Sequence, residues 1–286
     1  MSTDIPILDT HQHLIYPEKY PYSWTADIPQ LAGKAFRYDD YLKAIDGTTV
    51  SKTIFMESGA DDPHWHEETR FIHSLAITPG SLIKGIIASC RPEEEPGFES
   101  YVESVLSPSL VGLRRILHTE PDELSQRSCF ASNVRLLEEY ELTFDLCVLA
   151  RQIPLATELA GKCPDVQFIL DHCGVPDIAA GQIDPWRRHI SEISRLPNVA
   201  CKVSGVIAYC APGQAALETV RPYVEHCLEQ FGWDRVVWGS DWPVCTITSD
   251  LRTWVQVTHQ LIASADESDQ RKLLHENAIR IYGENR

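Results

Sequence analysis

Two histidines separated by one residue, His11 and His13, are the first side chains of the chain that could do chemistry together. In an extended segment, residues two apart point the same way, so both imidazoles face one side. Such a pair can present two nitrogens to a metal ion or to a polarised oxygen. The alternative is a pair of core histidines, each satisfied by a hydrogen bond. Because the pair directly follows an apolar run, Ile5–Asp9, we favour a functional role.

Two further polar positions, His172 and Asp241, follow apolar runs in the same way. The alternative for His172 is a structural histidine hydrogen-bonded to Asp171. The alternative for Asp241 is a helix cap, although residues 248–250 are better placed to begin the next helix. A buried carboxylate is costly unless it has partners, so Asp241 beside Trp242 should have some. We therefore predict that Asp241 and the three histidines share one site.

The elements that must position these side chains alternate regularly along the chain. Eight short apolar runs predict strands at Ile5–Asp9, Val50–Met56, Leu82–Ser89, Leu110–Leu117, Thr143–Leu149, Val166–His172, Val199–Val203 and Arg235–Trp238. Helical patterns lie between them, and a last amphipathic stretch covers Asp269–Tyr282. Strict alternation implies a parallel sheet, and eight repeats imply an α/β fold, a (β/α)8 TIM-type barrel. Residues 1–286 then form a single domain, with its active site at the carboxyl ends of the strands.

The composition excludes several classes of partner. The chain has 41 acidic and 25 basic residues, a net charge of −16, which repels phosphate backbones and argues against nucleic acid. No run reaches the roughly 20 apolar residues of a membrane helix, and the N-terminus lacks a secretory signal. Nine cysteines without a C-x-x-C pair favour buried free thiols in a reducing compartment. We expect a cytoplasmic protein, and the sequence leaves a homo-oligomer open.

The motifs at the strand ends resemble those of the amidohydrolase superfamily. They are most similar to its lactonase branch, which includes L-fuconolactonases, L-rhamnonolactonases and 2-pyrone-4,6-dicarboxylate lactonase. The matching motifs are Asp9-Thr10-His11-Gln12-His13, Gly112-Leu113-Arg114-Arg115, Leu170-Asp171-His172-Cys173-Gly174, Cys201-Lys202-Val203-Ser204-Gly205 and Trp238-Gly239-Ser240-Asp241-Trp242-Pro243-Val244. The resemblance runs nearly end to end and implies an enzyme that opens a small lactone. We predict that Asp241 is the general base for a water, and that His11, His13 and His172 stabilise the oxyanion.

This sequence departs from the superfamily pattern at two positions that bind metal ions in other members. Metal-dependent members have a bridging Lys or Glu on strand four and a histidine on strand five. This chain has Arg114 and Arg115 on strand four and no histidine on strand five, which argues against a two-metal centre. The lactonase resemblance implies little or no metal dependence, so we expect no required cofactor. The alternative is a single divalent ion such as zinc, held by His11, His13 and Asp241.

The remaining polar rim supplies candidates for substrate binding, namely Glu57, Arg114, Arg151, Lys202 and Trp242. Arg114 and Arg115 point to opposite sides of their strand, so at most one should enter the barrel mouth, and the resemblance favours Arg114. Lys202 has a structural alternative, pairing with Asp145 or Asp171, because an ionised lysine inside a strand is costly. The alternative for Trp242 is packing in the core without a ligand contact. Arg151 could instead cap the edge of the barrel, and Glu57 could instead hydrogen-bond to an imidazole of the site.

Three other functions fit parts of the pattern. A pyrone-dicarboxylate lactonase needs several arginines around the mouth, and Arg91, Arg114, Arg115 and Arg151 keep this alternative open. A metal-dependent decarboxylase of the same superfamily is disfavoured by the missing histidine. A barrel that only binds its ligand has no reason to keep a buried base. The sequence favours a small-molecule substrate, a sugar aldonolactone such as L-fucono- or L-rhamnonolactone.

Overall fold

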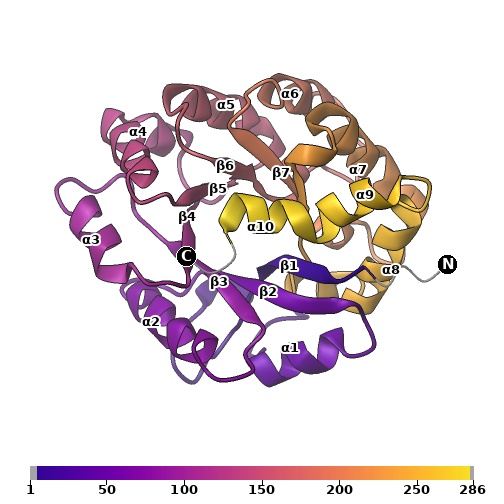
Figure 1. Cartoon of the computed structure of the whole chain (residues 1–286), viewed down its shortest axis with the longest axis horizontal. Coiled ribbons are helices and arrows are strands. Elements are labelled where there is room, and N and C mark those ends of the chain that lie inside the picture. Colours follow the sequence, from indigo (N-terminus) through magenta and orange to yellow (C-terminus); the bar gives the residue numbers. More distant parts are fainter. Residues whose placement is uncertain (1–4, 284–286) are drawn as a thin grey trace.

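A single sheet of eight parallel strands forms the centre of the fold. The computed structural model describes residues 5–283, and its strands neighbour one another in chain order from β1 to β8 (Figure 1). Their bounds are β1 Ile7–Gln12, β2 Val50–Met56, β3 Ile83–Ser89, β4 Leu110–Ile116, β5 Thr143–Cys147, β6 Phe168–Leu170, β7 Val199–Val203 and β8 Val236–Trp238. Just beyond β8, backbone hydrogen bonds from Asp241 N to His11 O and from His13 N to Trp242 O, both 2.8 Å, join the last strand to the first. The predicted (β/α)8 barrel is confirmed.

Helices surround this barrel and connect its strands (Figure 1). Their bounds are α1 Tyr38–Ile45, α2 Trp65–Ala76, α3 Phe98–Val105, α4 Ser128–Arg135, α5 Ile153–Lys162, α6 Trp186–Ile193, α7 Leu217–Phe231, α8 Leu251–Leu261, α9 Glu267–Arg271 and α10 Asn277–Tyr282. The final stretch is helical from Glu267 to Tyr282, and a π-helical turn at Lys272–Glu276 lies between α9 and α10. None of the helices in residues 5–283 has the length and apolar character needed to cross a bilayer.

The core has an outer and an inner part, because both faces of a parallel barrel are covered. The outer part packs the strands against the helices. The inner part joins strand residues such as Leu8, Ile54 and Val237 to Ala278 and Tyr282 of α10. Figure 1 shows α10 crossing one end of the barrel. The chain therefore closes that end itself, and the polar residues described next lie at the carboxyl ends of the strands.

Two strand ends differ from the prediction in ways that matter for the site. β1 continues through Gln12, so His11 lies inside the strand. β6 ends at Leu170, because His172 and Cys173 adopt positive φ angles of 55° and 53°. Side chains disfavour this left-handed conformation, and it turns the chain sharply away from the strand direction. The turn places His172 at the barrel mouth.

Candidate active site

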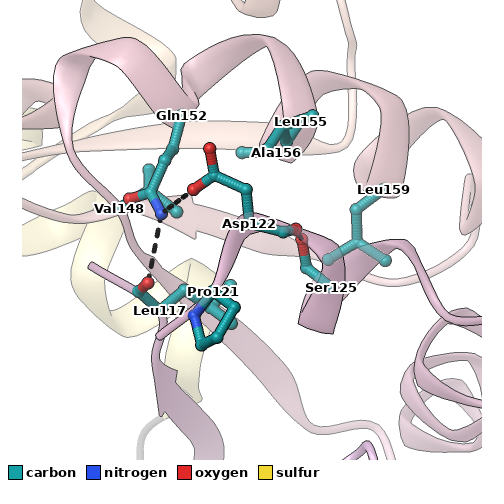
Figure 2. Close-up of a pocket in the computed structure, with 9 residues that line it drawn as sticks. All are labelled: Leu117, Pro121, Asp122, Ser125, Val148, Gln152, Leu155, Ala156 and Leu159. Atoms are coloured by element: carbon teal, nitrogen blue, oxygen red, sulfur yellow. Dashed lines mark hydrogen bonds between the residues drawn. The ribbon is translucent and has the colours of Figure 1, made fainter. Parts of the chain in front are cut away.

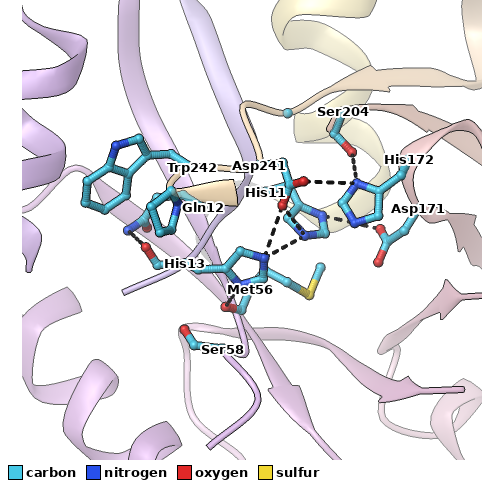
Figure 3. A network of polar contacts seen from close by, with 12 residues as sticks. His11, Gln12, His13, Met56, Ser58, Asp171, His172, Ser204, Asp241 and Trp242 are labelled. Atoms are coloured by element: carbon cyan, nitrogen blue, oxygen red, sulfur yellow. Dashed lines mark hydrogen bonds and ion pairs between the residues drawn. The ribbon is translucent and has the colours of Figure 1, made fainter. Parts of the chain in front are cut away.

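The four predicted site residues converge on one spot at the barrel mouth (Figure 3). His11 Nε2 lies 3.1 Å from His13 Nε2. Asp241 Oδ1 lies 3.3 Å from His13 Nε2 and 3.7 Å from His11 Nε2. His172 Nδ1 lies 3.8 Å from Asp241 Oδ2 and 3.0 Å from Ser204 Oγ. Residues from the end of β1 and from the segments directly after β1, β6, β7 and β8 thus form a single cluster.

The backbone around this cluster is shaped to allow the close approach. Asp241 has a positive φ of 56°, which directs its carboxylate toward the histidines while its N–H bonds to His11 O. Gly205, after β7, packs directly against the cluster. A Cβ there would collide with the Asp241 carboxylate and would lie 2.7 Å from His172 Nδ1. Only glycine fits this position.

The Nδ1 atoms of His11 and His13 face away from the centre of the cluster, toward oxygen atoms that can accept a hydrogen bond. His13 Nδ1 faces the carbonyl oxygens of Met56 and Glu57 at 3.1 and 3.0 Å. Carbonyls only accept, so this nitrogen holds a proton. His11 Nδ1 faces Asp171 Oδ1 at 3.5 Å, and burial lowers the pKa of His11 well below its usual value. A neutral His11 with its proton on Nδ1 therefore leaves its Nε2 as an acceptor.

Three acceptor atoms meet at the centre of the cluster if Nδ1 holds the only ring proton of His13, because His11 Nε2, His13 Nε2 and Asp241 Oδ1 then all carry lone pairs. The lone pairs of these three atoms repel one another unless a cation lies between them. The cation can be a proton on one imidazole or a metal ion. Tetrahedral zinc with bonds of 2.0–2.1 Å separates its ligand atoms by about 3.3 Å. The three separations here are 3.1, 3.3 and 3.7 Å. Ligand atoms of His11, His172 and Asp241 also lie within 4.8 Å of one another.

The residues therefore fit a single divalent ion. Histidine ligands of metals commonly donate their second ring N–H to a carboxylate or a carbonyl; His13 Nδ1 does so here, and His11 Nδ1 lies 3.5 Å from the Asp171 carboxylate. The absence of a required metal stays a prediction, and this geometry favours its alternative. β5 contributes Asp145 instead of a histidine, as the sequence indicated.

A buried layer of charge supports the cluster from inside the barrel. Asp171 Oδ1 lies 3.0 Å from Lys202 Nζ, and Asp171 Oδ2 lies 3.4 Å from Arg114 Nη1. Lys202 Nζ also contacts Asp145 at 2.5 Å. Burial alone would raise the pKa of Asp171, but Lys202 and His11 lower it well below its usual value. Asp171 is therefore a fixed negative charge beneath His11.

Lys202 is not among the residues that line the cavity, so the structure does not bring it to the position of a substrate contact. Its side chain is fully buried and lies between two carboxylates, Asp145 and Asp171. An ammonium removed from water needs such partners, and these neighbours raise the pKa of Lys202 despite its burial. The structural alternative for Lys202 is an ion pair with Asp145 or Asp171, and the structure has both pairs.

Arg114 and Glu57 lie together at the mouth, as predicted for the rim. Arg114 Nε lies 2.8 Å from Glu57 Oε1, and its Nη2 donates to Glu57 O at 2.8 Å. Its Nη1 also lies 3.4 Å from His11 Nε2. Arg115 borders the mouth as well, contrary to the expectation for the pair, and is held by Glu93 at 2.7 Å and Glu120 at 3.2 Å.

The mouth opens into a cavity of about 520 Å³, a size that suits a small-molecule ligand. Asp241, His13, His172, Arg114 and Glu57 all line it. Its other walls include residues that are not among the candidates from the sequence, namely Trp24, Ile28, Ser58, His118, Tyr209, Val244 and Ile247. Tyr209 belongs to the loop after β7, and no periodic pattern in that loop indicated which side chains face inward.

Two of the predicted substrate contacts lie elsewhere. Trp242 is 4% exposed, and its ring packs against Phe36 and Tyr41 at centroid distances of 5.6 and 5.5 Å. Trp242 therefore packs in the core and does not line the cavity. Arg151 is largely exposed and pairs with Asp122 at 2.5 Å.

Asp122 lies beside a separate hollow of about 10 Å³, shown in Figure 2, where Gln152 donates to it at 2.8 Å. That volume holds about one water molecule. Arg151 therefore lies at the barrel edge and not in the cavity.

The fold and this polar cluster at the strand ends define a barrel enzyme of the hydrolytic type. A sequence model of the amidohydrolase family matches residues 8–283, so the chain belongs to that family. The L-fucono-1,5-lactonase of Burkholderia ambifaria is 24% identical over 97% of this chain and 93% of its own length. The L-rhamnono-gamma-lactonase of Scheffersomyces stipitis is 27% identical over 70% and 69%, respectively. The structure of a Burkholderia multivorans amidohydrolase with bound zinc has a TM-score of 0.86 and 23% identity, covering 97% and 99% of the two chains.

Proposed function

We propose that this chain hydrolyses a small sugar lactone, such as L-fucono- or L-rhamnonolactone. The observation that carries the proposal is the meeting of Asp241 with three imidazoles at the inner end of a cavity large enough for a sugar ring. The names of the lactonase relatives, which match most of the chain, support the same reaction class. The cytoplasmic location and a homo-oligomeric state stay predictions.

Asp241 is the proposed general base. Its Oδ2 is buried and has no hydrogen-bond partner among residues 5–283, so it can take a proton from a water molecule. That water attacks the lactone carbonyl, and the same carboxyl group then passes the proton to the ring oxygen as the C–O bond breaks. A divalent ion held by His11, His13 and Asp241 would polarise the carbonyl and lower the pKa of the attacking water.

The other side chains of the mouth position the reacting groups. His172, fixed by Ser204, lies next to Asp241 Oδ2 and can donate to the oxyanion or to the leaving oxygen. Arg114 is held by Glu57 and Asp171, so its guanidinium is oriented before the substrate binds. Asp171 holds the His11 ring in place through Nδ1.

The charge around the cavity favours a neutral polyhydroxy substrate over a dicarboxylate. Three arginines border the cavity in the described part of the chain, and each already has a carboxylate partner. Arg91 pairs with Asp62 at 3.1 Å, Arg114 with Glu57, and Arg115 with Glu93 and Glu120. A pyrone dicarboxylate would have to displace these partners, whereas sugar hydroxyls can bond to the paired groups as they are.

The test is a proton-release assay over a panel of aldonolactones and a pyrone dicarboxylate. We expect turnover of at least one neutral sugar lactone and a 10²–10⁴-fold lower kcat in Asp241→Asn, the usual cost of losing a general base. Asp46→Asn removes an exposed surface carboxylate and serves as the matched control. Full activity in Asp241→Asn would refute the mechanism. Turnover of the dicarboxylate alone, or release of CO2 instead of ring opening, would refute the substrate class.

A further inference from the structure

A second group of potential metal ligands lies outside the active site. Cys173 follows β6, Cys201 lies on β7, and Cys227 lies on α7. All three side chains are fully buried, and their sulfur atoms lie within 4.8 Å of one another. Cys201 alternates along β7 with the inward-facing Lys202, so it faces the helices. The three cysteines belong to the outer core and share no ligand with the histidine cluster.

We propose that Cys173, Cys201 and Cys227, the cysteine triad, bind one monovalent soft metal ion of the Cu(I) type. The donor set contains sulfur only, and thiolate ligands select soft ions such as Cu(I) over harder divalent ions. The triad offers three donors in a buried, apolar layer, whereas structural zinc sites almost always have four ligands. Cu(I) is satisfied by three.

The separations of the sulfur atoms suit this coordination. Three sulfurs in a plane around an ion, with metal–sulfur bonds of about 2.3 Å, are about 4.0 Å apart. The largest separation in the triad is 4.8 Å or less, so each sulfur would move by well under one ångström. The contact that the Cys173 thiol would give up is weak, a 3.8 Å hydrogen bond to Lys202 O.

Charge balance also favours a monovalent ion. The metal replaces the proton of one thiol, forming a metal–sulfur bond and releasing that proton to water. The remaining two thiols can bind through their lone pairs, so the ion with one thiolate is neutral overall. Because burying a net charge in apolar surroundings is costly, a neutral complex is the least expensive occupant. No oxidant or reductant takes part.

The ion would brace the turn that positions His172. Cys173 lies in that turn, where His172, Cys173 and Val175 all have positive φ angles. Such conformations persist only where the surroundings hold them in place. Trp186 Nε1 already donates to Cys173 O at 2.7 Å. A metal bond from Cys173 to β7 and α7 would fix the same turn from its side-chain end.

The test is an anaerobic titration of the full chain with Cu(I) in the presence of a competing Cu(I) chelator, with EDTA added to keep divalent ions away from the histidines. Cys129, the one partly exposed cysteine, is replaced by serine in every sample. We expect one equivalent of copper to be retained, with an increase in Tm of at least about 5 °C at saturating ion. Cys201→Ser and Cys227→Ala should each lose that equivalent. Cys163→Ser, which changes another buried thiol outside the triad, should keep it.

X-ray absorption of the copper-loaded protein makes the test independent of how well the variants fold. Three sulfur neighbours at about 2.3 Å support the proposal. Nitrogen neighbours, no retained copper, or unchanged retention in Cys201→Ser and Cys227→Ala would each overturn it.

Discussion

Replacing Lys202 by methionine tests the charge layer beneath the active site. The substitution keeps the length and volume of the side chain but leaves Asp145 and Asp171 without the cation that lies 2.5 and 3.0 Å away. Removing one partner of a buried ion pair usually costs 3–5 kcal/mol. In a chain of this size, each kcal/mol shifts Tm by about 2–4 °C, so we expect a decrease of about 10 °C.

A second substitution, at Asp145, shows whether the loss of stability in Lys202→Met comes from an unpaired buried carboxylate or from another cause. In Lys202→Met/Asp145→Asn, the position of Asp145 no longer has a charge, and its amide oxygen can still accept from Tyr282 Oη, now 3.3 Å away. Asp171 keeps Arg114 as its partner. We expect the double variant to recover at least half of the lost stability. Lys84→Met, at an exposed position of β3, is the control and should change Tm by less than 2 °C, or about 0.5 kcal/mol.

The assay combines thermal unfolding with steady-state kinetics on whichever lactone the wild type opens. We expect kcat to fall in the double variant, because Asp171 holds His11 less firmly, while KM stays unchanged. A destabilisation below about 1 kcal/mol, or no recovery in the double variant, would refute the role as a buried counter-ion. A raised KM at unchanged stability would instead support a contact between Lys202 and the substrate.

The other predictions concern pH, two tryptophans and metal ions. Burial raises the pKa of Glu68 to about 8 from 4.5, so the folded protein keeps a proton that the unfolded chain releases between these values, and stability falls as pH rises through this range. Between pH 5 and pH 8.5, the stability of Glu68→Gln relative to wild type should therefore increase by a few kcal/mol. Thermal unfolding across this pH range measures it, and a difference in Tm that does not change with pH would contradict the prediction. Trp24→Leu should raise KM several-fold with little change in Tm, whereas Trp242→Leu should lower Tm and leave KM unchanged, because only Trp24 lines the cavity. Dialysis against a chelator should lower kcat at least tenfold and added zinc should restore it; full activity in protein with less than about 0.1 equivalent of metal by elemental analysis would favour a protonated imidazole instead.

The barrel and the four central residues could be predicted because their signals are local. Apolar runs mark strands buried on both faces, and polar residues at the ends of those runs mark the catalytic side of a barrel. His11 and His13 share a side by the two-residue period of a strand. The sequence therefore indicated both the fold and the place where Asp241 and His172 would meet them.

Three predicted substrate contacts, Trp242, Arg151 and Lys202, do not line the cavity, and strand spacing alone could not show this. Asp241 has a left-handed backbone, so Trp242 is directed into the outer core instead of the mouth. Arg151 follows β5 in a short 3-10 turn, where alternation no longer fixes the direction of the side chain. Lys202 faces inward as its strand position requires, but its depth and its two carboxylate partners depend on β5 and the β6 turn. Contacts between such distant segments leave no trace in local spacing.

Helix α10 covers one end of the barrel, so the active-site cavity is reached only from the opposite end, where the strands have their carboxyl ends. Substrate and product must share the same route past the loops of the mouth, so release of one and entry of the next are sequential events. Tyr282 of this helix also contacts Asp145, so the floor helps to hold the charges beneath the histidines. A chain that stops before residue 277 would leave inner core residues such as Leu8, Ile54 and Val237 without the cover of α10. Its catalytic groups would lose their rigid support even with every one of them present.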